Sequence, residues 1–283
     1  MINQLTIDDY LILALAEDVG DGDVTSLACI PDKKVSKAKL IVKADGIIAG
    51  IDIAKRIFSL VDDSLILKIN ILDGAPVKSG DIAFYVEGNA QSILKAERLV
   101  LNCMQRMSGI ATKTNQLAHL IKDYKSKLLD TRKTTPNFRV FEKMAVKIGG
   151  GHNHRFGLFD MILIKDNHVD FAGGISNAIN AANEFLHKSG KDLQIEIEAR
   201  NLDEVKEILS IGRINRILLD NFSISDIKSA MDLIDGKFET EASGNITAKN
   251  IVDYAKCGVD FISMGALTHS YSSLDLSLKA YKD

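Results

Sequence analysis

The sequence predicts an α/β fold in which a small α+β domain precedes a larger domain built as a barrel of repeated βα units. Two observations lead to this prediction. Residues 37–88 form short β-rich runs separated by Asp-Gly and Ser-Gly turns. Beyond residue 108, short apolar strands alternate with helix-like segments, a pattern that implies parallel strands. With 283 residues, 46% of them hydrophobic, the chain can bury a substantial core.

The N-terminal part is expected to begin with a short amphipathic helix. Thr6 followed by Asp9 is a typical helix start, and Gly20 marks the expected end. The β-rich runs that follow include residues 39–42 and 65–69, which we predict to be strands. These elements together make up the small α+β domain.

A longer helix is predicted from about residue 91 to residue 107. Ser108-Gly109 indicates a break before a second helical stretch, because glycine is a poor helix former. We take this break as the domain boundary. The predicted domains are therefore residues 1–107 and 108–267, and the tail 268–283 is expected to pack back on the first of them.

Six apolar strands, each followed by a helix-like segment, are predicted beyond the boundary. They are residues 127–130, 161–165, 194–198, 216–220, 238–242 and 261–264. Gly190, Gly212 and Gly258 predict helix ends, whereas Ser225 and Thr247 predict helix starts. In a barrel of such units the C-terminal strand ends meet at one mouth, so residues that are far apart in the sequence converge there on a ligand.

Cationic side chains follow these strands or a run of glycines. They are Arg132, Lys133, His154, Arg155 and Lys165. Each charge-assisted hydrogen bond contributes about 1.5 to 3 kcal/mol, so together they could bind carboxylates or phosphates. The glycines at 149–151 would let main-chain N–H groups approach such a ligand. Arg98 lies beside Glu97 on the predicted helix, so the local pattern fits a solvated helix face as well as it fits a binding site.

Glu198 and Asp220 end two of the apolar strands, where a buried carboxylate is costly unless it meets a metal, a hydroxyl or a cation. They suggest binding of Mg²⁺ or of sugar hydroxyls, with simple pairing to the cations as the alternative. Two glycine-containing loops follow the last two strands, where barrels often hold a phosphate. These loops contain Ser243, Gly244 and Asn245, and Met264, Gly265 and Ala266.

The composition excludes several classes of protein. A formal net charge of −3 argues against general nucleic-acid binding, so any anion site must be local. The three cysteines lie far apart and form no Cys-x-x-Cys pair, which favours a reduced, cytoplasmic protein. The first residues lack the regions of a secretory signal, and no run reaches the roughly 18 apolar residues that span a bilayer. We therefore expect a protein without membrane or nucleic-acid partners.

Several motifs in this chain occur together in one known family. They run from Asp130 to Pro136, Gly149 to Arg155, Ile164 to His168, Leu219 to Asn221, Ala242 to Gly244, and Gly265 to Ser270. With these motifs the chain resembles quinolinate phosphoribosyltransferase over nearly its whole length. Asn137 stands where that family is expected to have glycine, and Lys147 where arginine is common. Asparagine tolerates a left-handed backbone, so these departures concern local loop geometry.

The resemblance implies a fold, an activity and a cofactor. The fold is an incomplete (β/α) barrel beside an open α+β sandwich. The activity converts quinolinate and phosphoribosyl pyrophosphate into nicotinate mononucleotide, CO₂ and pyrophosphate during NAD biosynthesis, and it requires Mg²⁺. The resemblance further implies a homo-oligomer, with a dimer favoured, in which Arg98 reaches the barrel of a neighbouring copy.

The resemblance also implies roles for individual residues. Arg98, Arg132, His154, Arg155 and Lys165 resemble the quinolinate clamp, with Thr131 and Lys133 also close to substrate. Glu198 and Asp220 resemble the ribose and magnesium side, with the metal held directly or through water or substrate. The loops at 243–245 and 264–266 resemble the cradle of the 5′-phosphate. The implied catalytic residues are Lys133, Lys165, Glu198 and Asp220.

Four other hypotheses remain open on the sequence. A ModD-type pyrophosphorylase of the same fold would act on another acceptor. A Schiff-base barrel aldolase would use Lys165 as its nucleophile. A carrier module would use the turn at residues 77–81, although no lysine there has the setting of a biotinyl lysine. His152 and His154, with His168 downstream, raise zinc binding, but no cysteine or carboxylate completes a known ligand spacing.

Overall fold

The computed structural model describes residues 5–281, which form two compact units. Unit 1 holds the residues up to 115, residues 134–150 and those from 267 onward, whereas unit 2 holds residues 116–133 and 151–266. The chain thus contributes three separate segments to unit 1, while the sequence-based domains followed chain order. Within residues 5–281, no helix combines the length and the apolar character that crossing a membrane requires.

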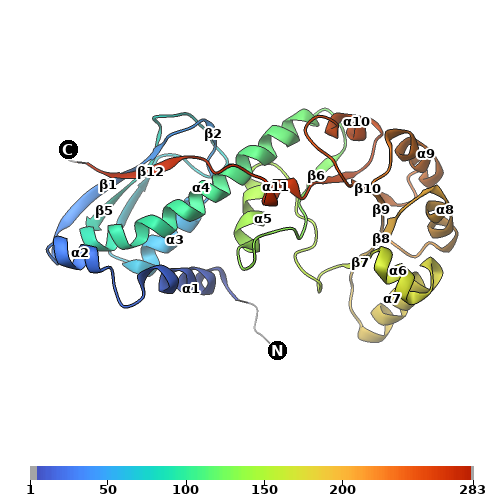
Figure 1. The fold of residues 1–283 in the computed structure, drawn as a ribbon, viewed down its shortest axis with the longest axis horizontal. Helices are drawn as coiled ribbons and strands as arrows, with labels where there is room; N and C mark the ends of the chain where they lie inside the picture. The colour runs from blue at the N-terminus through green and yellow to red at the C-terminus, as the bar shows by residue number, and fades with distance from the viewer. Residues whose placement is uncertain (1–4, 282–283) are drawn as a thin grey trace. The chain divides into compact units, whose positions relative to one another are not determined.

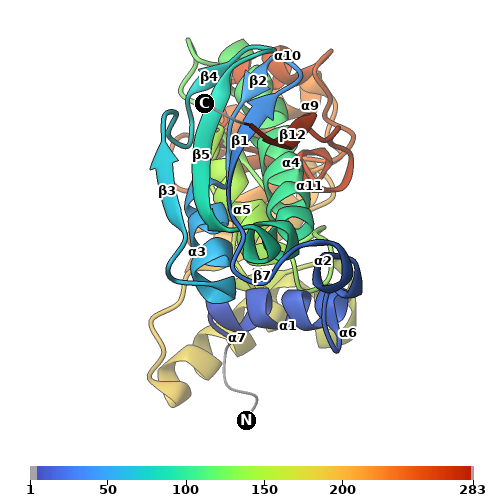
Figure 2. The same ribbon diagram turned by 90° about the vertical axis from the view of Figure 1, so that its left-hand side faces the viewer.

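Unit 1 contains a four-stranded antiparallel sheet with the strand order β12-β1-β5-β3 (Figure 2). Its strands are β1 (Val35–Val42), β3 (Ile66–Ile69), β5 (Ile82–Asn89) and β12 (Leu276–Ala280), and a separate pair joins β2 (Gly46–Ile47) to β4 (Pro76–Val77). Ala38, Leu40 and Val42 alternate along β1 and are buried, as expected of a strand with one face in the core. Both predicted strands therefore fall in this sheet.

The helices of the N-terminal half and of the end of the chain are α1 (Ile7–Val19), α2 (Val24–Cys29), α3 (Ile51–Val61), α4 (Ala90–Leu120), α5 (Arg139–Ile148) and α11 (Ala266–His269). The prediction for α1 is confirmed, because Thr6 and Asp9 form a capping box and Gly20 ends the helix. Helix α3 packs on the sheet through Phe58, whose ring meets that of Phe84 edge-on at 6.0 Å between centroids.

The predicted helix break at Ser108-Gly109 is wrong, because α4 continues through both residues. The Ser108 hydroxyl accepts a hydrogen bond from the Ala49 N–H at 2.9 Å. A Cβ atom on Gly109 would lie 2.2 Å from the carbonyl oxygen of Ser272. Glycine therefore lets the C-terminal segment cross the helix closely, and its presence reflects packing instead of a helix end.

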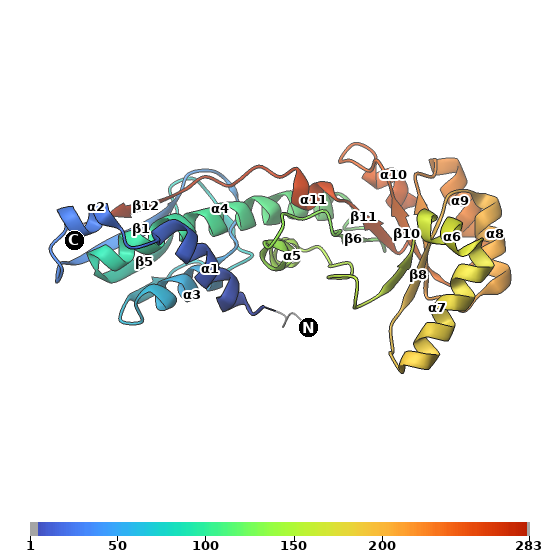
Figure 3. The ribbon, with the colours of Figure 1, turned by 60° about the horizontal axis from the view of Figure 1, so that its bottom comes forward.

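Unit 2 contains a six-stranded parallel sheet with the order β6-β11-β10-β9-β8-β7 (Figures 1 and 3). The strands are β6 (Lys127–Leu129), β7 (Ile162–Ile164), β8 (Ile195–Ala199), β9 (Arg216–Asp220), β10 (Glu239–Ser243) and β11 (Phe261–Ser263). All six predicted strands are thus confirmed to within one residue at each end. Leu129 in β6 also forms a parallel bridge to His152. In the described part of the chain this edge does not pair with β7, so the barrel is incomplete, as expected.

The helices that follow the strands of unit 2 are α6 (Asp166–Ala172), α7 (Ile175–Ser189), α8 (Leu202–Ile211), α9 (Ile224–Ile234) and α10 (Ile251–Lys256). Helices α7 to α9 lie on one side of strand β8 (Figure 3). Gly190 and Gly212 end α7 and α8 as predicted. These helices do not cover the opposite face of the sheet or its carboxyl edge, where other side chains lie.

Two predicted helix starts are displaced. Helix α9 is capped by Ser223 and not by Ser225, because the Ser223 hydroxyl accepts the hydrogen bond from the Asp226 N–H. Helix α10 follows Asn250, whereas Thr247 opens the preceding turn by donating its N–H to the Asn250 side chain. Both errors arise because a polar residue near a helix start can cap either the helix or a turn before it.

Candidate active site at the carboxyl edge of the parallel sheet

Most predicted site residues lie at or just beyond the carboxyl ends of the six parallel strands. Asp220 of β9 pairs in register with Ser243 of β10, and on its other side β9 pairs with β8, where Glu198 lies opposite Leu218, two residues before Asp220. Side chains two residues apart on a strand share a face, so Glu198, Asp220 and Ser243 lie on one side of the sheet. Arg98 is the exception, because it is exposed on α4 in unit 1.

Lys165, directly after β7, pairs with Glu198 on β8. Their Nζ and Oε2 atoms lie 3.1 Å apart, and the Lys165 side chain is 48% exposed while that of Glu198 is 9% exposed. Burial raises the pKa of Glu198, and the charge of Lys165 opposes this rise. Because Lys165 is engaged in this ion pair at the sheet edge, the arrangement suits anion binding better than a Schiff-base nucleophile.

Arg132 and Arg155 concentrate positive charge beside this pair. Burial lowers the pKa of Arg155, the charge of Arg132 lowers it further, and Glu196 and Asp160 act in the opposite direction. The Arg155 guanidinium donates to the Met161 carbonyl at 3.2 Å. An arriving anion would relieve the repulsion between the two guanidinium groups, which favours carboxylate or phosphate binding here.

Smaller contacts fix the other residues of this region. Lys133 donates its N–H to the Thr131 hydroxyl at 3.1 Å, which shapes the turn after β6. Arg155 and His168 border a cavity of about 350 Å³ whose other walls are apolar side chains of β7, α6, α7 and the segment before β7. The Lys165 N–H donates to His168 Nδ1 at 3.0 Å, so His168 supports the start of α6.

An amide network joins the ends of β9 and β10. Asn221 donates to the Asp220 carboxylate at 2.6 Å and accepts from the Asn245 side-chain amide at 3.0 Å. A Cβ atom on Gly244 would lie 2.2 Å from Asn221 Oδ1, and Gly244 has a φ of +95°. Asn221 and Asn245 also adopt positive φ, of 56° and 51°. Asn221 thus links the predicted ribose carboxylate to the predicted phosphate loop.

The second predicted phosphate loop follows β11. Met264 donates its N–H to the Leu129 carbonyl at 3.0 Å, which ties the loop to β6. Gly265 comes next, and Ala266 is the first residue of α11. The residues 264–266 therefore lie at the same sheet edge as the other predicted groups, and their phosphate role stays a prediction.

The glycine run at 149–151 has a partly different explanation. A Cβ atom on Gly149 would lie 2.4 Å from the Ala111 carbonyl oxygen, so this glycine allows α5 to end close against α4. Gly150 has a φ of +90°, which favours glycine. Asn137, where the resemblance led us to expect glycine, has a φ of +61°, so asparagine does adopt the left-handed backbone there.

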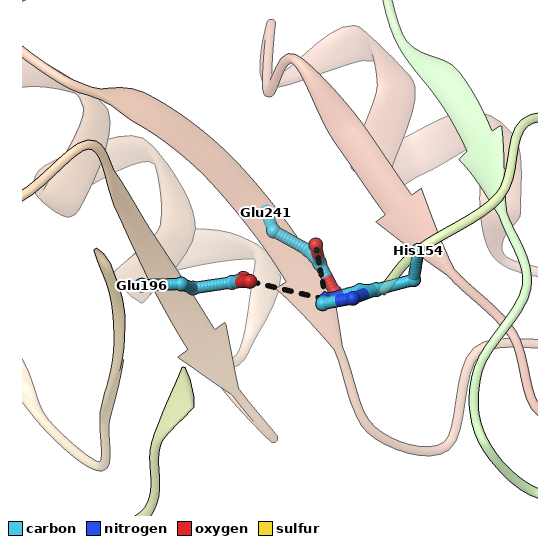
Figure 4. Close-up of side chains that lie close together, drawn as sticks. All are labelled: His154, Glu196 and Glu241. Carbon is cyan, nitrogen blue, oxygen red and sulfur yellow. Dashed lines mark ion pairs between the residues drawn. The ribbon is translucent and has the colours of Figure 1, made fainter. Parts of the chain in front are cut away.

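A buried charged cluster lies beneath the predicted site (Figure 4). His154 Nε2 lies 3.0 Å from Glu196 Oε2 and 3.4 Å from Glu241 Oε2. Arg216 approaches Glu241 at 3.2 Å and stacks on the Phe261 ring at 3.9 Å. The side chains of Glu196 and Glu241 are 0% and 1% exposed, and that of His154 is 7% exposed.

The two buried carboxyl groups bind protons more tightly than ordinary glutamates. Burial raises the pKa of Glu196 to about 7, against the pull of Arg216, and raises that of Glu241 to about 8, helped by the charge of Glu196. Burial thus outweighs pairing with the cations. The Glu196 oxygens and Glu241 Oε1 accept no hydrogen bond from the rest of the described chain.

The sequence reasoning missed Glu196, Arg216 and Glu241. All three lie inside strands, where we had treated them only as part of a strand pattern. The available signal was the alternation Ile195-Glu196-Ile197-Glu198, which places a second charge on the face of a predicted site residue. This cluster also supplies the carboxylates that the zinc hypothesis lacked, but around His154 alone and without His152 or His168.

Glu198 and Asp220 fit the hard, oxygen-ligated magnesium ion that the resemblance implies. They end neighbouring strands, and each offers carboxylate oxygens. The charge of Asp220 contributes to the raised pKa of Glu198, so the two carboxylates are close enough to act on each other. A divalent cation near both would relieve this repulsion, and the donor set is therefore suitable.

Comparison with known proteins decides the family. A model described as the quinolinate phosphoribosyl transferase C-terminal domain matches residues 110–279, and one described as the N-terminal domain matches residues 23–108. This chain belongs to the quinolinate phosphoribosyltransferase family. The two models meet next to the predicted boundary at 107. The family assignment thus rests on nearly the whole chain and not on a single motif.

Individual members of the quinolinate phosphoribosyltransferase family agree with this assignment. A decarboxylating quinolinate phosphoribosyltransferase from Nicotiana tabacum is 47% identical over 282 residues, which cover 94% of this chain and 80% of that protein. The chloroplastic carboxylating nicotinate-nucleotide pyrophosphorylase of Arabidopsis thaliana has the same identity and coverage. The structure of the Francisella tularensis nicotinate-nucleotide pyrophosphorylase matches with a TM-score of 0.90 and 40% identity, covering 99% of each chain.

Proposed function

We propose that this chain transfers the phosphoribosyl group of phosphoribosyl pyrophosphate to quinolinate and releases CO₂ and pyrophosphate. The product is nicotinate mononucleotide, a precursor of NAD. The observation that carries this proposal is the match of both family models, which together span residues 23–108 and 110–279. The concentration of cations and carboxylates at one sheet edge supports it.

Substrate binding is assigned to the cations after β6 and β7. The two substrates bring roughly six or seven negative charges, which one cation could not balance. Arg132, Arg155 and Lys165 are assigned to the two carboxylates of quinolinate, with Thr131 and His154 beside them. Lys133 is assigned to the phosphates. We further propose that Arg98, exposed on α4, completes this clamp in a second copy of the chain.

Transfer breaks the bond between the ribose C1 and pyrophosphate and forms a bond from C1 to the ring nitrogen of quinolinate. The ribose carbon becomes cation-like as pyrophosphate leaves, and Glu198 and Asp220 stabilise that positive charge and orient the ribose hydroxyls. The bond from the ring to its 2-carboxylate then breaks, CO₂ departs, and a proton takes its place on the ring carbon. The adjacent ring nitrogen is cationic at this stage, and its charge stabilises the electron pair left on the ring carbon until that carbon takes the proton.

The remaining groups hold the phosphates and the metal. The loops at 243–245 and 264–266 are assigned to the 5′-phosphate, which their main-chain N–H groups would bind. Glu198 and Asp220 would hold Mg²⁺, directly or through water or substrate, and the metal would neutralise charge on the departing pyrophosphate. We propose that the protein works as a homo-oligomer, in the simplest case a dimer, in the cytoplasm.

The activity is tested with purified full-length protein, quinolinate, phosphoribosyl pyrophosphate and Mg²⁺. We expect nicotinate mononucleotide by chromatography and one equivalent of CO₂ from quinolinate labelled at the 2-carboxyl group. Nicotinate, which lacks that carboxyl group, serves as the control acceptor and should not react. Absence of turnover on quinolinate together with turnover on another acceptor would favour the pyrophosphorylase alternative.

Two further measurements test the finer assignments. Chelation with EDTA should abolish turnover, and Mg²⁺ should restore it. Mixing an Arg98→Ala variant with a Lys165→Met variant should restore part of the activity if each site takes its arginine from the other copy. Mixtures that remain as inactive as the separate variants would place Arg98 outside the site. Sedimentation gives the oligomeric state directly, and microscopy of the tagged full chain tests its location.

A further inference from the structure

The glutamates of the cluster formed by His154, Glu196 and Glu241 lie on the strands of the proposed site, further from the carboxyl edge of the sheet. Glu196 precedes Glu198 by two residues on β8, and Glu241 precedes Ser243 by two residues on β10. Both therefore share the face of the proposed catalytic groups but sit below them. Figure 4 shows the side chains of Glu196 and Glu241 directed toward the ring of His154.

The hydrogen bonds around His154 select one form of its ring. The Arg155 N–H donates to His154 Nδ1 at 2.7 Å, so this nitrogen carries a lone pair and no proton. The ring proton then belongs to Nε2, which faces Glu196 and Glu241 at 3.0 and 3.4 Å. The imidazole is thus hydrogen-bonded to the Arg155 backbone at Nδ1, while its Nε2 end lies against the two buried carboxyls.

The same geometry disfavours a metal ion in this cluster. A metal would need the lone pair of Nε2, which is the nitrogen that carries the proton here. Arg216 already supplies a positive charge 3.2 Å from Glu241. A divalent ion would add further positive charge below the cationic groups of the site.

The segment that carries His154 is held by hydrogen bonds from its backbone N–H groups. The His152 N–H donates to the Leu128 carbonyl at 2.8 Å, and the His154 N–H donates to the Asp130 carboxylate at 2.9 Å. The next donor along the chain is the Arg155 N–H, and its acceptor is the His154 ring itself. The position of the Arg155 backbone therefore depends on the position of that ring.

We propose that Glu241, together with Glu196, is a positioning residue that acts through His154 to fix the Arg155 backbone and so aims its guanidinium at a substrate carboxylate. This inference rests on the proposed function. The carboxyls of Glu196 and Glu241 thus help to position the Arg155 guanidinium without contacting it.

The test begins with Glu241→Gln, which keeps the size of the side chain and replaces its carboxyl group by an amide. We expect the dissociation constant and the KM of quinolinate to rise about tenfold, the loss for one charge-assisted hydrogen bond. The KM of phosphoribosyl pyrophosphate and kcat should stay within about threefold. Glu239→Gln is the matched control, because Glu239 is on the same strand and pairs with Arg216 at 3.0 Å but is 48% exposed. It should leave quinolinate binding unchanged.

A double-mutant cycle with His154→Asn tests whether the effect passes through the imidazole. Asparagine can keep an acceptor near the Nδ1 position but cannot reach the glutamates. If Glu241 acts through His154, Glu241→Gln should change quinolinate affinity less than twofold in the His154→Asn background. Effects that multiply would instead assign Glu241 a separate role and overturn the inference. Should Glu241→Gln fail to fold, as judged by circular dichroism, Glu196→Gln takes its place in the same cycle.

Two other outcomes would also overturn the inference, and they are distinguishable from each other. An active wild-type protein whose quinolinate affinity is unchanged by Glu241→Gln would remove the positioning role while leaving the proposed function intact. A wild-type protein that neither binds nor converts quinolinate would remove both. In a calorimetric titration with zinc chloride alone, stoichiometric binding that Glu241→Gln abolishes would assign the cluster to a metal instead.

Discussion

Replacing the buried Glu241 by glutamine should change how the stability of the protein depends on pH. Burial raises the pKa of Glu241 to about 8 in the folded protein, whereas in an unfolded chain this carboxyl returns to its ordinary pKa of 4.5. The folded state therefore binds a proton that the unfolded state has already lost at neutral pH. The stabilisation linked to this proton is complete below about pH 4.5 and disappears as the pH rises through about 8.

The size of the effect follows from the two pKa values. One proton of difference corresponds to a slope of about 1.4 kcal/mol per pH unit. Between pH 6 and pH 8 the wild-type protein should lose roughly 2 kcal/mol through Glu241, because the folded-state carboxyl is itself half ionised at the upper limit. The Glu241→Gln variant lacks this loss, so its stability relative to wild type should rise by that amount over the same interval.

Urea unfolding at pH 6, 7 and 8, at constant ionic strength and followed by circular dichroism, measures this difference. The transition midpoints of wild type and Glu241→Gln should approach or cross as the pH rises, with unchanged slopes m. Glu239→Gln is the control, since Glu239 lies on the same strand but is 48% exposed. Parallel curves for wild type and Glu241→Gln across this range would refute a proton bound by Glu241 in the folded state.

Three other changes test separate parts of the structure. Lys165→Met should lower kcat/KM for quinolinate about 100-fold, because it removes a charge-assisted contact. The control Lys188→Met, on the exposed face of α7, should have no effect. Equal activities of the two variants in steady-state assays would contradict the anion-binding role of Lys165. Asn221→Ala should raise the KM of phosphoribosyl pyrophosphate about tenfold, because the link between the β9 and β10 loops is lost, and an unchanged KM would count against that link. Gly109→Ala should lower the stability measured by thermal unfolding by about 2 kcal/mol or more, because the new Cβ would lie 2.2 Å from the Ser272 carbonyl oxygen. At a helix glycine without this contact, the change to alanine would instead stabilise the protein by about 1 kcal/mol. A stabilised Gly109→Ala variant would therefore disprove the packing argument.

The strand order along the chain and the edge that carries the site were predictable from the sequence. Each strand of unit 2 is a short apolar run, and polar residues such as Lys165 and Asp220 follow directly, so local patterns were sufficient. The cations and carboxylates were recognised one at a time because each stands at a strand end. Their convergence followed from the parallel topology alone.

Features that depend on contacts between distant segments were not predictable. Gly109 looks like a helix break, and only the passage of Ser272 across α4 explains why the helix continues. Glu196 and Glu241 look like ordinary strand residues, and only the sheet register brings both to His154. In each case the residue that contacts these side chains lies more than 40 positions away in the sequence, which is beyond the range of any periodic pattern.

The pairing of β12 with β1 has a consequence for the order in which the protein forms. Leu278 of the last strand lies opposite Leu40 of the first, so the antiparallel sheet is completed by residues near the end of the chain. During synthesis, the outer edge of β1 therefore stays without its native neighbour until the distant β12 has been made. An exposed strand edge is a template for association with other chains, which makes nascent and C-terminally truncated forms the species most prone to aggregate.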